Sequence, residues 1–288
     1  MSQYICVDIG GTSIKHGVLD ENAIIKECNQ TKTEAWLGGA AVLDKVKTIG
    51  KQYKEQYENI EGICISTAGM VDPEEGKIVF AGELMPGYTG TCIKKELEKA
   101  LEMPCEVEND VNCAGLAEYV SGSAKESHIM FCATVGTGIG GCAIVNGRVF
   151  HGASNSACEV GYIPMGDSDF QTLGASSILV RKVAEKKIEP LDMWDGKKIF
   201  ALAEKGDKVC ISAIKEMCDV LGKGLATICY VLNPDTIVLG GGIMVQKKIL
   251  ENEIRDSLNR YLRPILAEHL QVCFAEYGNE AGMVGAFV

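Results

Sequence analysis

The sequence lacks any apolar run long enough to cross a membrane. Across its 288 residues, no hydrophobic stretch approaches the roughly 20 residues that a membrane-spanning helix needs. The first residues enter an apolar strand pattern at Tyr4–Val7 instead of the basic and then apolar pattern of a secretory signal. We therefore expect a cytoplasmic protein with no membrane partner.

Basic residues are also fewer than acidic ones. The chain has 28 Lys and Arg against 39 Asp and Glu, for a formal net charge of −11. Surfaces that bind nucleic acids or anionic membranes need a basic footprint, so we expect no nucleic-acid partner. A small phosphate compound such as ATP is still possible, because Mg²⁺ and backbone N–H groups can neutralise its charge locally.

The thirteen cysteines lack the spacing of a metal site or a disulfide framework. There is no C-x-x-C and no Cys/His ladder of the zinc-binding type. Several lie in apolar strand or helix patterns, among them Cys6, Cys64, Cys132, Cys142 and Cys229. Reduced cysteines in such places act as small hydrophobic residues. They indicate a reducing compartment and a role as core filler.

Two common nucleotide-binding motifs are missing as well. No G-x-x-x-x-G-K-[ST] segment occurs, and the run Gly136-Thr137-Gly138-Ile139-Gly140-Gly141 continues as strand, not as the helix that a dinucleotide fingerprint requires. These absences exclude a P-loop nucleotide-binding protein and an NAD-binding protein of the dinucleotide-fingerprint type.

The expected secondary-structure elements alternate between strand and helix. We expect strands near 3–8, 13–19, 23–29, 60–66, 105–107, 128–135, 142–146, 236–239 and 270–275, and helices near 39–57, 94–101, 111–120, 175–187, 197–204, 208–232 and 247–260.

One glycine turn follows the first strand directly. The segment Asp8-Ile9-Gly10-Gly11-Thr12-Ser13-Ile14-Lys15 offers an acid, paired glycines, a hydroxyl and a base within eight residues. Paired glycines let the backbone approach a large group, and N–H groups in such a turn form an anion site. The alternative is a plain hairpin turn.

Two further glycine-rich turns follow apolar strands. They are Gly136-Thr137-Gly138 and Gly240-Gly241-Gly242. Turns at strand ends can converge on one crevice, although three independent tight turns would give the same sequence pattern. The strand–turn–strand pattern of 8–15 is echoed in 135–142, which suggests two related lobes. No Pro- or Ser-rich linker separates them, so we expect a hinge near 109–122.

Two polar segments complete the candidate chemistry. Glu108-Asn109-Asp110-Val111-Asn112 places two acids and two amides at a predicted helix start. N-capping is the simple explanation, but a carboxylate here could also accept a proton from a substrate hydroxyl. In Glu159-Val160-Gly161-Tyr162, an acid and a phenol three residues apart could reach the hydroxyls of a polyol, or could belong to a surface loop.

Taken in order, these segments resemble the ROK family of sugar kinases and repressors over essentially the whole chain. Besides those above, Ser66–Asp72 resembles the S-x-x-G-x-V-D turn of the family, and Leu84–Gly90 its sugar-side loop. The resemblance implies an α/β, two-lobed actin/hexokinase/Hsp70-like ATPase fold with ribonuclease H-like lobes and a cleft between them. Residues 1–115 would form the sugar-side lobe, with the C-terminal helix packed back on it, and 116–288 the nucleotide-side lobe.

The chain departs from the family pattern at two places. The family usually has His where Tyr162 stands, and its C-x-C-G-x-x-G-C-x-E zinc segment is missing, with no cysteine between Tyr162 and Ser176. The glutamate that ends this segment falls at or near Gln171. We therefore expect no structural zinc, as in a subset of the family that includes some β-glucoside kinases.

The resemblance also implies an activity, which is ATP-dependent phosphorylation of a hexose-type hydroxyl, in a homodimer. Asp110 would be the general base, and Asp8 would hold the Mg²⁺ that accompanies ATP. The remaining site residues would be Gly69, Asn109, Glu159 and Tyr162 for the sugar, and Gly10, Gly11, Thr12, Lys15, Gly136, Thr137, Gly138, Gly241 and Gly242 for ATP.

Several alternatives remain at this stage. The sugar could be glucose, N-acetylmannosamine, a β-glucoside or fructose. A repressor of the same family would carry a DNA-binding arm before the first phosphate motif, yet only seven residues precede Asp8, and the net charge is acidic. A sugar- or ATP-binding module without transfer is the remaining rival, against which the presence of Asp110 argues.

Overall fold

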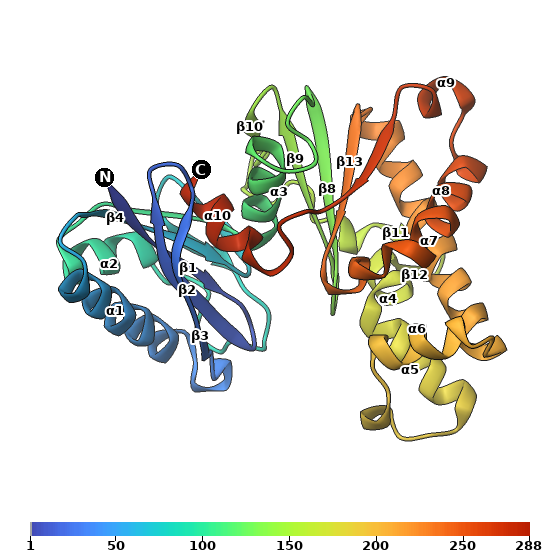
Figure 1. Ribbon diagram of the computed structural model, residues 1–288, viewed down its shortest axis with the longest axis horizontal. Helices are drawn as coiled ribbons and strands as arrows, with labels where there is room; N and C mark the ends of the chain where they lie inside the picture. Colours follow the sequence, from blue (N-terminus) through green and yellow to red (C-terminus); the bar gives the residue numbers. More distant parts are fainter. Residues whose placement is uncertain (1) are drawn as a thin grey trace. The chain divides into compact units, whose positions relative to one another are not determined.

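A computed structural model describes residues 2–288, which form two compact units (Figure 1). Unit 1 holds the chain up to Gly122 together with Val149–Ala157 and Asn279–Val288. Unit 2 holds Ser123–Arg148 and Cys158–Gly278. Each unit is built on a five-stranded mixed sheet with helices, so the two-lobed α/β architecture expected from the sequence is confirmed.

The sheet of unit 1 has the strand order β3-β2-β1-β4-β7. Strand β1 is antiparallel to β2 and parallel to β4, and β4 is parallel to β7. A short antiparallel hairpin, β5–β6, accompanies this sheet. The bounds are β1 Gln3–Ile9, β2 Ser13–Asp20, β3 Ile25–Lys32, β4 Ile60–Thr67, β5 Met70–Asp72, β6 Lys77–Phe80 and β7 Cys105–Asn109.

Helices cover both faces of this sheet, which is why its central strands are buried along most of their length. On one face, Ile5 and Val7 pack with Val46 of α1 and Leu97 of α2 in the core. On the other face, the C-terminal helix α10, red in Figure 1, contacts β1, β4 and α3. The helices of unit 1 are η1 Ala35–Leu37, α1 Gly39–Gln56, α2 Ile93–Leu101, α3 Asp110–Val120 and α10 Ala281–Phe287; η5 Gly278–Glu280 precedes α10.

The sheet of unit 2 has the order β10-β9-β8-β13-β14. Strand β8 is antiparallel to β9 and parallel to β13, and β13 is parallel to β14. The second sheet thus repeats the arrangement of the first, with a hairpin followed by parallel strands. The bounds are β8 Ile129–Val135, β9 Ile139–Val145, β10 Arg148–Val149, β13 Thr236–Gly240 and β14 Gln271–Phe274, with the separate pair β11 Pro164–Met165 and β12 Ser168–Asp169.

The core of unit 2 is organised around the long helix α7. Its apolar stripe, which includes Met217, Leu221 and Leu225, is buried against the other helices and the sheet. Gly224 brings the α7 backbone against the ring of Phe170 in α4. The helices are η2 Val160–Tyr162, α4 Phe170–Gly174, α5 Ser176–Lys187, η3 Leu191–Met193, α6 Gly196–Glu204, α7 Lys208–Leu232, η4 Gly242–Gln246, α8 Lys247–Tyr261 and α9 Pro264–Ala267.

Most of the cysteines lie in these cores, as expected of small apolar fillers. Nine of the thirteen are buried. Burial raises the pKa of the thiols of Cys113 and Cys105, which disfavours the reactive thiolate. Among residues 2–288, no helix is both long enough and apolar enough to span a bilayer.

Candidate functional site

Three parallel strands of unit 1 bring polar residues to one edge of the sheet. In the register of β1, β4 and β7, Asp8 lies beside Ser66, and Ser66 lies beside Glu108. One residue further along, Thr67 lies beside Asn109. The carboxyl ends of parallel strands are where open α/β sheets commonly bind ligands. The candidate residues near Asp8 and near Asn109 therefore share one edge, although 101 positions separate them in the sequence.

Asp8 is held on both of its carboxylate oxygens. Ser66 Oγ donates to Oδ1 at 2.7 Å, and Lys15 Nζ lies 3.8 Å from Oδ2. Burial raises the pKa of Asp8, while Ser66 and Lys15 act in the opposite direction. Helix α10 causes part of this burial, because a Cβ on Gly282 would lie 2.5 Å from Asp8 Cγ. Asp8 is thus a largely buried carboxylate whose charge is only partly compensated.

The first glycine turn is tied down by a buried threonine. Thr33 Oγ1 donates to Gly10 O at 2.6 Å, and Thr33 N donates to Thr12 O at 3.1 Å. Within the turn, Gly10 N donates to Ser13 O at 3.0 Å. Gly11 and Thr12 are exposed at its tip. The loop is therefore fixed at its base and open at its tip, which suits a group that must be approached by backbone N–H groups.

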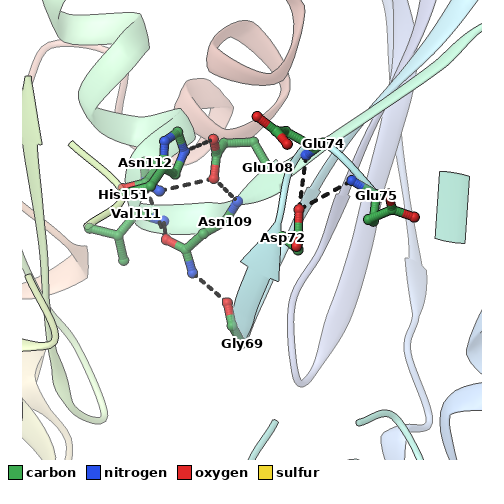
Figure 2. Close-up of polar contacts among 9 residues, drawn as sticks. All are labelled: Gly69, Asp72, Glu74, Glu75, Glu108, Asn109, Val111, Asn112 and His151. Carbon is green, nitrogen blue, oxygen red and sulfur yellow. Dashed lines mark hydrogen bonds and ion pairs between the residues drawn. The ribbon is translucent and has the colours of Figure 1, made fainter. Parts of the chain in front are cut away.

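Asn109 both caps helix α3 and orients Asp110. Its Oδ1 accepts from the backbone N–H groups of Val111 at 2.8 Å and Asn112 at 3.1 Å. Its Nδ2 donates to Gly69 O at 2.8 Å (Figure 2) and to Asp110 Oδ1 at 3.1 Å. Capping and function were competing explanations for this residue. One side chain can serve both, because the amide oxygen caps while the amide nitrogen reaches the neighbouring carboxylate.

Gly69 supplies a backbone carbonyl to this network. Its φ of +103° lies in a region that L side chains rarely adopt, and a Cβ here would lie 2.8 Å from Phe80 O. Tyr88 is buried nearby, with its hydroxyl 2.7 Å from Thr67 Oγ1. Burial, with a smaller contribution from Asp110, raises the pKa of Tyr88 to about 12. The phenol therefore stays protonated close to the Asp110 carboxylate.

Glu108 joins the same network from the end of β7. Its Oε1 accepts from Asn109 N at 2.7 Å and from Asn112 Nδ2 at 2.9 Å. Its Oε2 lies 2.7 Å from Nε2 of His151, which comes from the segment between β10 and η2 (Figure 2). Figure 2 shows Asn109, Asn112 and His151 grouped around this carboxylate.

Unit 2 places its own glycine turn between β8 and β9. Gly136 N donates to Gly138 O at 2.9 Å. Ser176 at the start of α5 donates to Gly136 O through both its N–H, at 2.9 Å, and its Oγ, at 2.6 Å. Ser177 Oγ donates to Thr137 O at 2.7 Å. Backbone carbonyls of the turn are thus engaged by serine hydroxyls from the following helix.

The third turn abuts the second. Gly241 follows β13 with φ +97°, and a Cβ there would overlap the backbone of Val135, the last residue of β8. Only glycine fits this combination of dihedral angle and close approach. Gly242, by contrast, has open space where a Cβ would stand. Within unit 2 the structure therefore brings the turns after β8 and β13 to the same end of the sheet.

A family model described as "ROK family" matches residues 4–288. The chain belongs to the ROK family. It is 44% identical over its whole length to an uncharacterized protein of Clostridium perfringens, covering 97% of that protein. It is 30% identical to a beta-glucoside kinase of Klebsiella pneumoniae, over 97% of this chain and 93% of that protein.

A solved structure supports the same assignment. The ROK family glucokinase from Streptomyces griseus, in complex with glucose and AMPPNP, matches with a TM-score of 0.85 and 28% identity, over 99% of this chain and 98% of that one. The resemblance stated from the sequence is thus confirmed at the level of family and fold.

The remaining ROK motif positions lie in unit 2. Glu159 is exposed at the surface, although partial desolvation of its carboxylate raises its pKa. Tyr162 is 58% exposed. Gln171 Oε1 lies close to both Gly138 and Gly161, 2.8 Å and 2.9 Å from where their Cβ atoms would be. Gln171 therefore packs between the glycine turn after β8 and the segment that carries Glu159 and Tyr162.

Sequence reasoning missed Thr33 and Ser66 as supports of these turns, and missed the pairing of Glu108 with His151. Ser66 had a detectable signal, because it is a polar residue at the end of an apolar strand. Thr33 and His151 had none, because each reaches its partner through folding, over 23 and 43 positions of sequence. Among residues 2–288, no group of three or more His, Cys, Asp or Glu is placed to hold a metal ion.

Proposed function

We propose that this ROK protein is an ATP-dependent sugar kinase that phosphorylates a hydroxyl of a hexose-type sugar. One observation carries the proposal: the Asn109 amide links Gly69 O to Asp110 Oδ1, so that a carboxylate is held in a defined orientation at the start of α3. The similarity to a glucokinase with bound glucose and AMPPNP supports the choice of ligands.

Asp110 is the general base in this proposal. As the sugar oxygen attacks the γ-phosphorus of ATP, the hydroxyl proton passes to the Asp110 carboxylate, and the bond from phosphorus to the β,γ-bridging oxygen breaks to release ADP. General base catalysis contributes roughly 10²–10⁴-fold. Positioning and charge neutralisation provide most of the remaining acceleration in phosphoryl transfer. Asn109 Nδ2 keeps Asp110 oriented for this step.

The sugar is assigned to residues with complementary donors and acceptors. Asn109 presents an amide beside the base, and the Gly69 turn shapes the backbone next to it. Glu159 and Tyr162 would accept from and donate to further hydroxyls. The raised pKa of Glu159 is compatible with a carboxylate that gains stability when a polyol hydroxyl donates to it.

The phosphates of ATP are assigned to the two glycine turns that follow the first strand of each sheet. In unit 1 these are Gly10, Gly11 and Thr12, with Lys15 as the adjacent cation. In unit 2 they are Gly136, Thr137 and Gly138. Backbone N–H groups in such turns bind anions without requiring basic side chains, in agreement with the acidic net charge of −11. Gly241 and Gly242 are assigned to the adenosine.

The structure contains a suitable residue for Mg²⁺. Magnesium prefers carboxylate oxygens and water, and Asp8 is a largely buried carboxylate whose pKa is raised despite Ser66 and Lys15. A cation near Asp8 would compensate this charge. Mg²⁺ bound there would neutralise charge on the transferring phosphoryl group. Asp8 would hold it directly or through water.

The test is phosphoryl transfer itself. The full-length protein is incubated with ATP, Mg²⁺ and one sugar at a time: glucose, fructose, N-acetylmannosamine, N-acetylglucosamine or a phenyl β-glucoside. ADP release and the mass of the sugar phosphate are both measured, and a no-sugar control corrects for hydrolysis. We expect one sugar to be phosphorylated well above the others. ATP binding without any sugar phosphate across the panel would contradict the proposal.

A further inference from the structure

His151 lies against Glu108, which precedes the candidate base Asp110 by two residues, although His151 comes from a distant part of the chain. It belongs to Val149–Ala157, a segment assigned to unit 1 that lies between β10 and η2 of unit 2 in the sequence. The segment closes on itself, since Ala157 N donates to His151 O at 3.0 Å. The imidazole is 28% exposed, and the Glu108 side chain that it contacts is 15% exposed.

The Glu108 carboxylate receives three donors with different origins. Oε1 accepts from Asn109 N and Asn112 Nδ2, at 2.7 Å and 2.9 Å, and Oε2 faces His151 Nε2 at 2.7 Å (Figure 2). An ionised carboxylate has no hydrogen to donate, so Nε2 of His151 must carry the proton. Charge-assisted hydrogen bonds of this kind are stronger than neutral ones.

This arrangement links His151 to the candidate base in two steps. Glu108 fixes the backbone N–H of Asn109 and the side chain of Asn112, one on each side of Asp110. Asn109 then donates from Nδ2 to Asp110 Oδ1 at 3.1 Å. His151 binds Glu108, and Glu108 in turn binds Asn109 and Asn112, so the influence of His151 on the start of α3 passes through Glu108 (Figure 2).

We propose that Glu108 and His151 are a positioning pair that fixes the start of α3, with Asn109 and Asp110, in its sugar-binding, proton-accepting geometry. This inference rests on the function proposed above. Glu108 and His151 are thereby added to the residues of the proposed site, and His151 lies outside every motif by which the sequence resembles ROK kinases. Neither residue acts on the sugar itself. Both act through the orientation of Asn109 and Asp110.

The pair makes this geometry sensitive to pH. The hydrogen bond to Glu108 raises the pKa of His151, against the opposing effect of burial, and Asp72 adds a smaller increase. Other ionisable groups around the pair are Asp110 and the buried thiol of Cys113; Asp72 is itself held by the N–H groups of Glu74 and Glu75. Because the pKa is raised, the pair is strongest at low pH and weakens as pH rises through that pKa.

Two substitutions of His151 and one of Glu108 separate the roles of hydrogen bond, charge and size. His151→Phe removes the donor, and we expect the sugar KM to rise about tenfold with the ATP KM unchanged, the scale of one charge-assisted hydrogen bond. His151→Gln keeps a neutral donor, so we expect it to recover most of that loss. The Gln variant should also lose the dependence of the sugar KM on pH, because Gln does not titrate as the imidazole does.

Glu108→Gln tests the direction of the pH effect. A Gln at this position can keep its oxygen toward Asn109 and Asn112 while its amide donates to an unprotonated His151. Neutral His151 is then the favoured partner. We expect the sugar KM of Glu108→Gln to improve as pH rises, whereas that of the natural protein worsens. The same direction in both proteins would overturn the inference.

His16→Gln is the matched control. His16 lies in the same unit and is 2.9 Å from Tyr53 Oη through Nδ1, so the substitution also removes an imidazole with one hydrogen bond. We expect its sugar KM and pH profile to match those of the natural protein. If His151→Phe lowers only the melting temperature and leaves kcat, the sugar KM and their pH dependence unchanged, the pair is merely structural and the inference is wrong.

A second readout does not depend on catalysis. The His151 imidazole resonances, assigned by their loss in His151→Gln, should titrate above those of His16 and move to lower pH in Glu108→Gln. The backbone amide hydrogen of Asn109, which Glu108 binds, should exchange with solvent faster in His151→Phe. A natural protein that transfers no phosphoryl group would refute the proposed function alone. Unchanged Asn109 exchange in His151→Phe would refute the positioning pair.

Discussion

Each unit has a glycine turn after the first strand of its sheet, and a hydroxyl binds the carbonyl of the first glycine in both, but the surrounding chemistry differs. In unit 1, Thr33 Oγ1 donates to Gly10 O at 2.6 Å, and in unit 2, Ser176 Oγ donates to Gly136 O at the same distance. Two residues before the first glycine, however, unit 1 has Asp8, where unit 2 has Thr134. The backbone support is repeated, whereas the ionisable group is found only at the first turn.

The difference extends beyond the turns. The edge of unit 1 gathers Asp8, Glu108 and Asp110 with Lys15 and His151 as their cationic or titratable neighbours. The turns of unit 2 are shaped by serine hydroxyls, the Gln171 amide and close glycine packing. We infer that unit 1 supplies acid–base chemistry and metal binding, and that unit 2 supplies a shaped backbone for the nucleotide. The predictions below would break or sharpen this division.

The largest effect is expected at Asp110. Asp110→Asn keeps the size of the side chain and its place in α3 but removes the proton acceptor, so kcat should fall by roughly 10²–10⁴-fold while the sugar still binds. Steady-state kinetics and sugar titration measure the two quantities. The matched control is Asp195→Asn, which changes the N-cap of α6 to another good cap. Full activity in Asp110→Asn would show that Asp110 is not the general base.

A smaller effect is expected at the third turn of unit 2. Gly241→Ala would place a Cβ against the Val135 backbone at φ +97°, and strain and overpacking together cost about 3 kcal/mol. We expect a lower melting temperature and a weaker affinity for AMPPNP. The control Gly196→Ala, at the start of α6, meets open space and should change neither. Equal behaviour of the two variants would show that the shape of this turn is not what the nucleotide requires.

The smallest of these effects is expected at Ser66. Ser66→Ala removes the donor to Asp8 Oδ1, which at present lowers the pKa of Asp8 against the effect of burial. The pKa should rise further, so the acid limb of the pH–activity profile should shift to higher pH. Activity at neutral pH should fall about tenfold, as for one hydrogen bond to a charged group. An unshifted acid limb would mean that Asp8 does not control it.

The sequence predicted the regular elements well because their signals are local. The helix expected near 39–57 is Gly39–Gln56, and the one expected at 208–232 has these bounds in the structure. The hairpin of β5 and β6 was missed, because its short strands end in exposed residues such as Val79 and Phe80. The stretch 152–174, for which no strand or helix was expected, contains α4, whose N-cap Asp169 accepts from Thr172 N.

The candidate site could be predicted only in part. Asp8 and Asn109 lie at strand ends and Asp110 at a helix start, where local sequence marks them. Their supports cannot be recognised in the same way, since Ser66 reaches Asp8 through strand register and His151 reaches Glu108 through tertiary packing. Local patterns identify which side chains can do chemistry. Which neighbours orient them depends on the packed structure.

The division between the units is tested most directly by the two KM values of one variant from each. Asn109→Ser keeps a capping hydroxyl but loses the amide that reaches Gly69 and Asp110, and Ser176→Ala removes the hydroxyl that holds Gly136 O. We predict that Asn109→Ser raises the sugar KM at least tenfold and leaves the ATP KM within twofold, with the reverse pattern in Ser176→Ala. If both variants raise the same KM, the division of chemistry between the units is wrong.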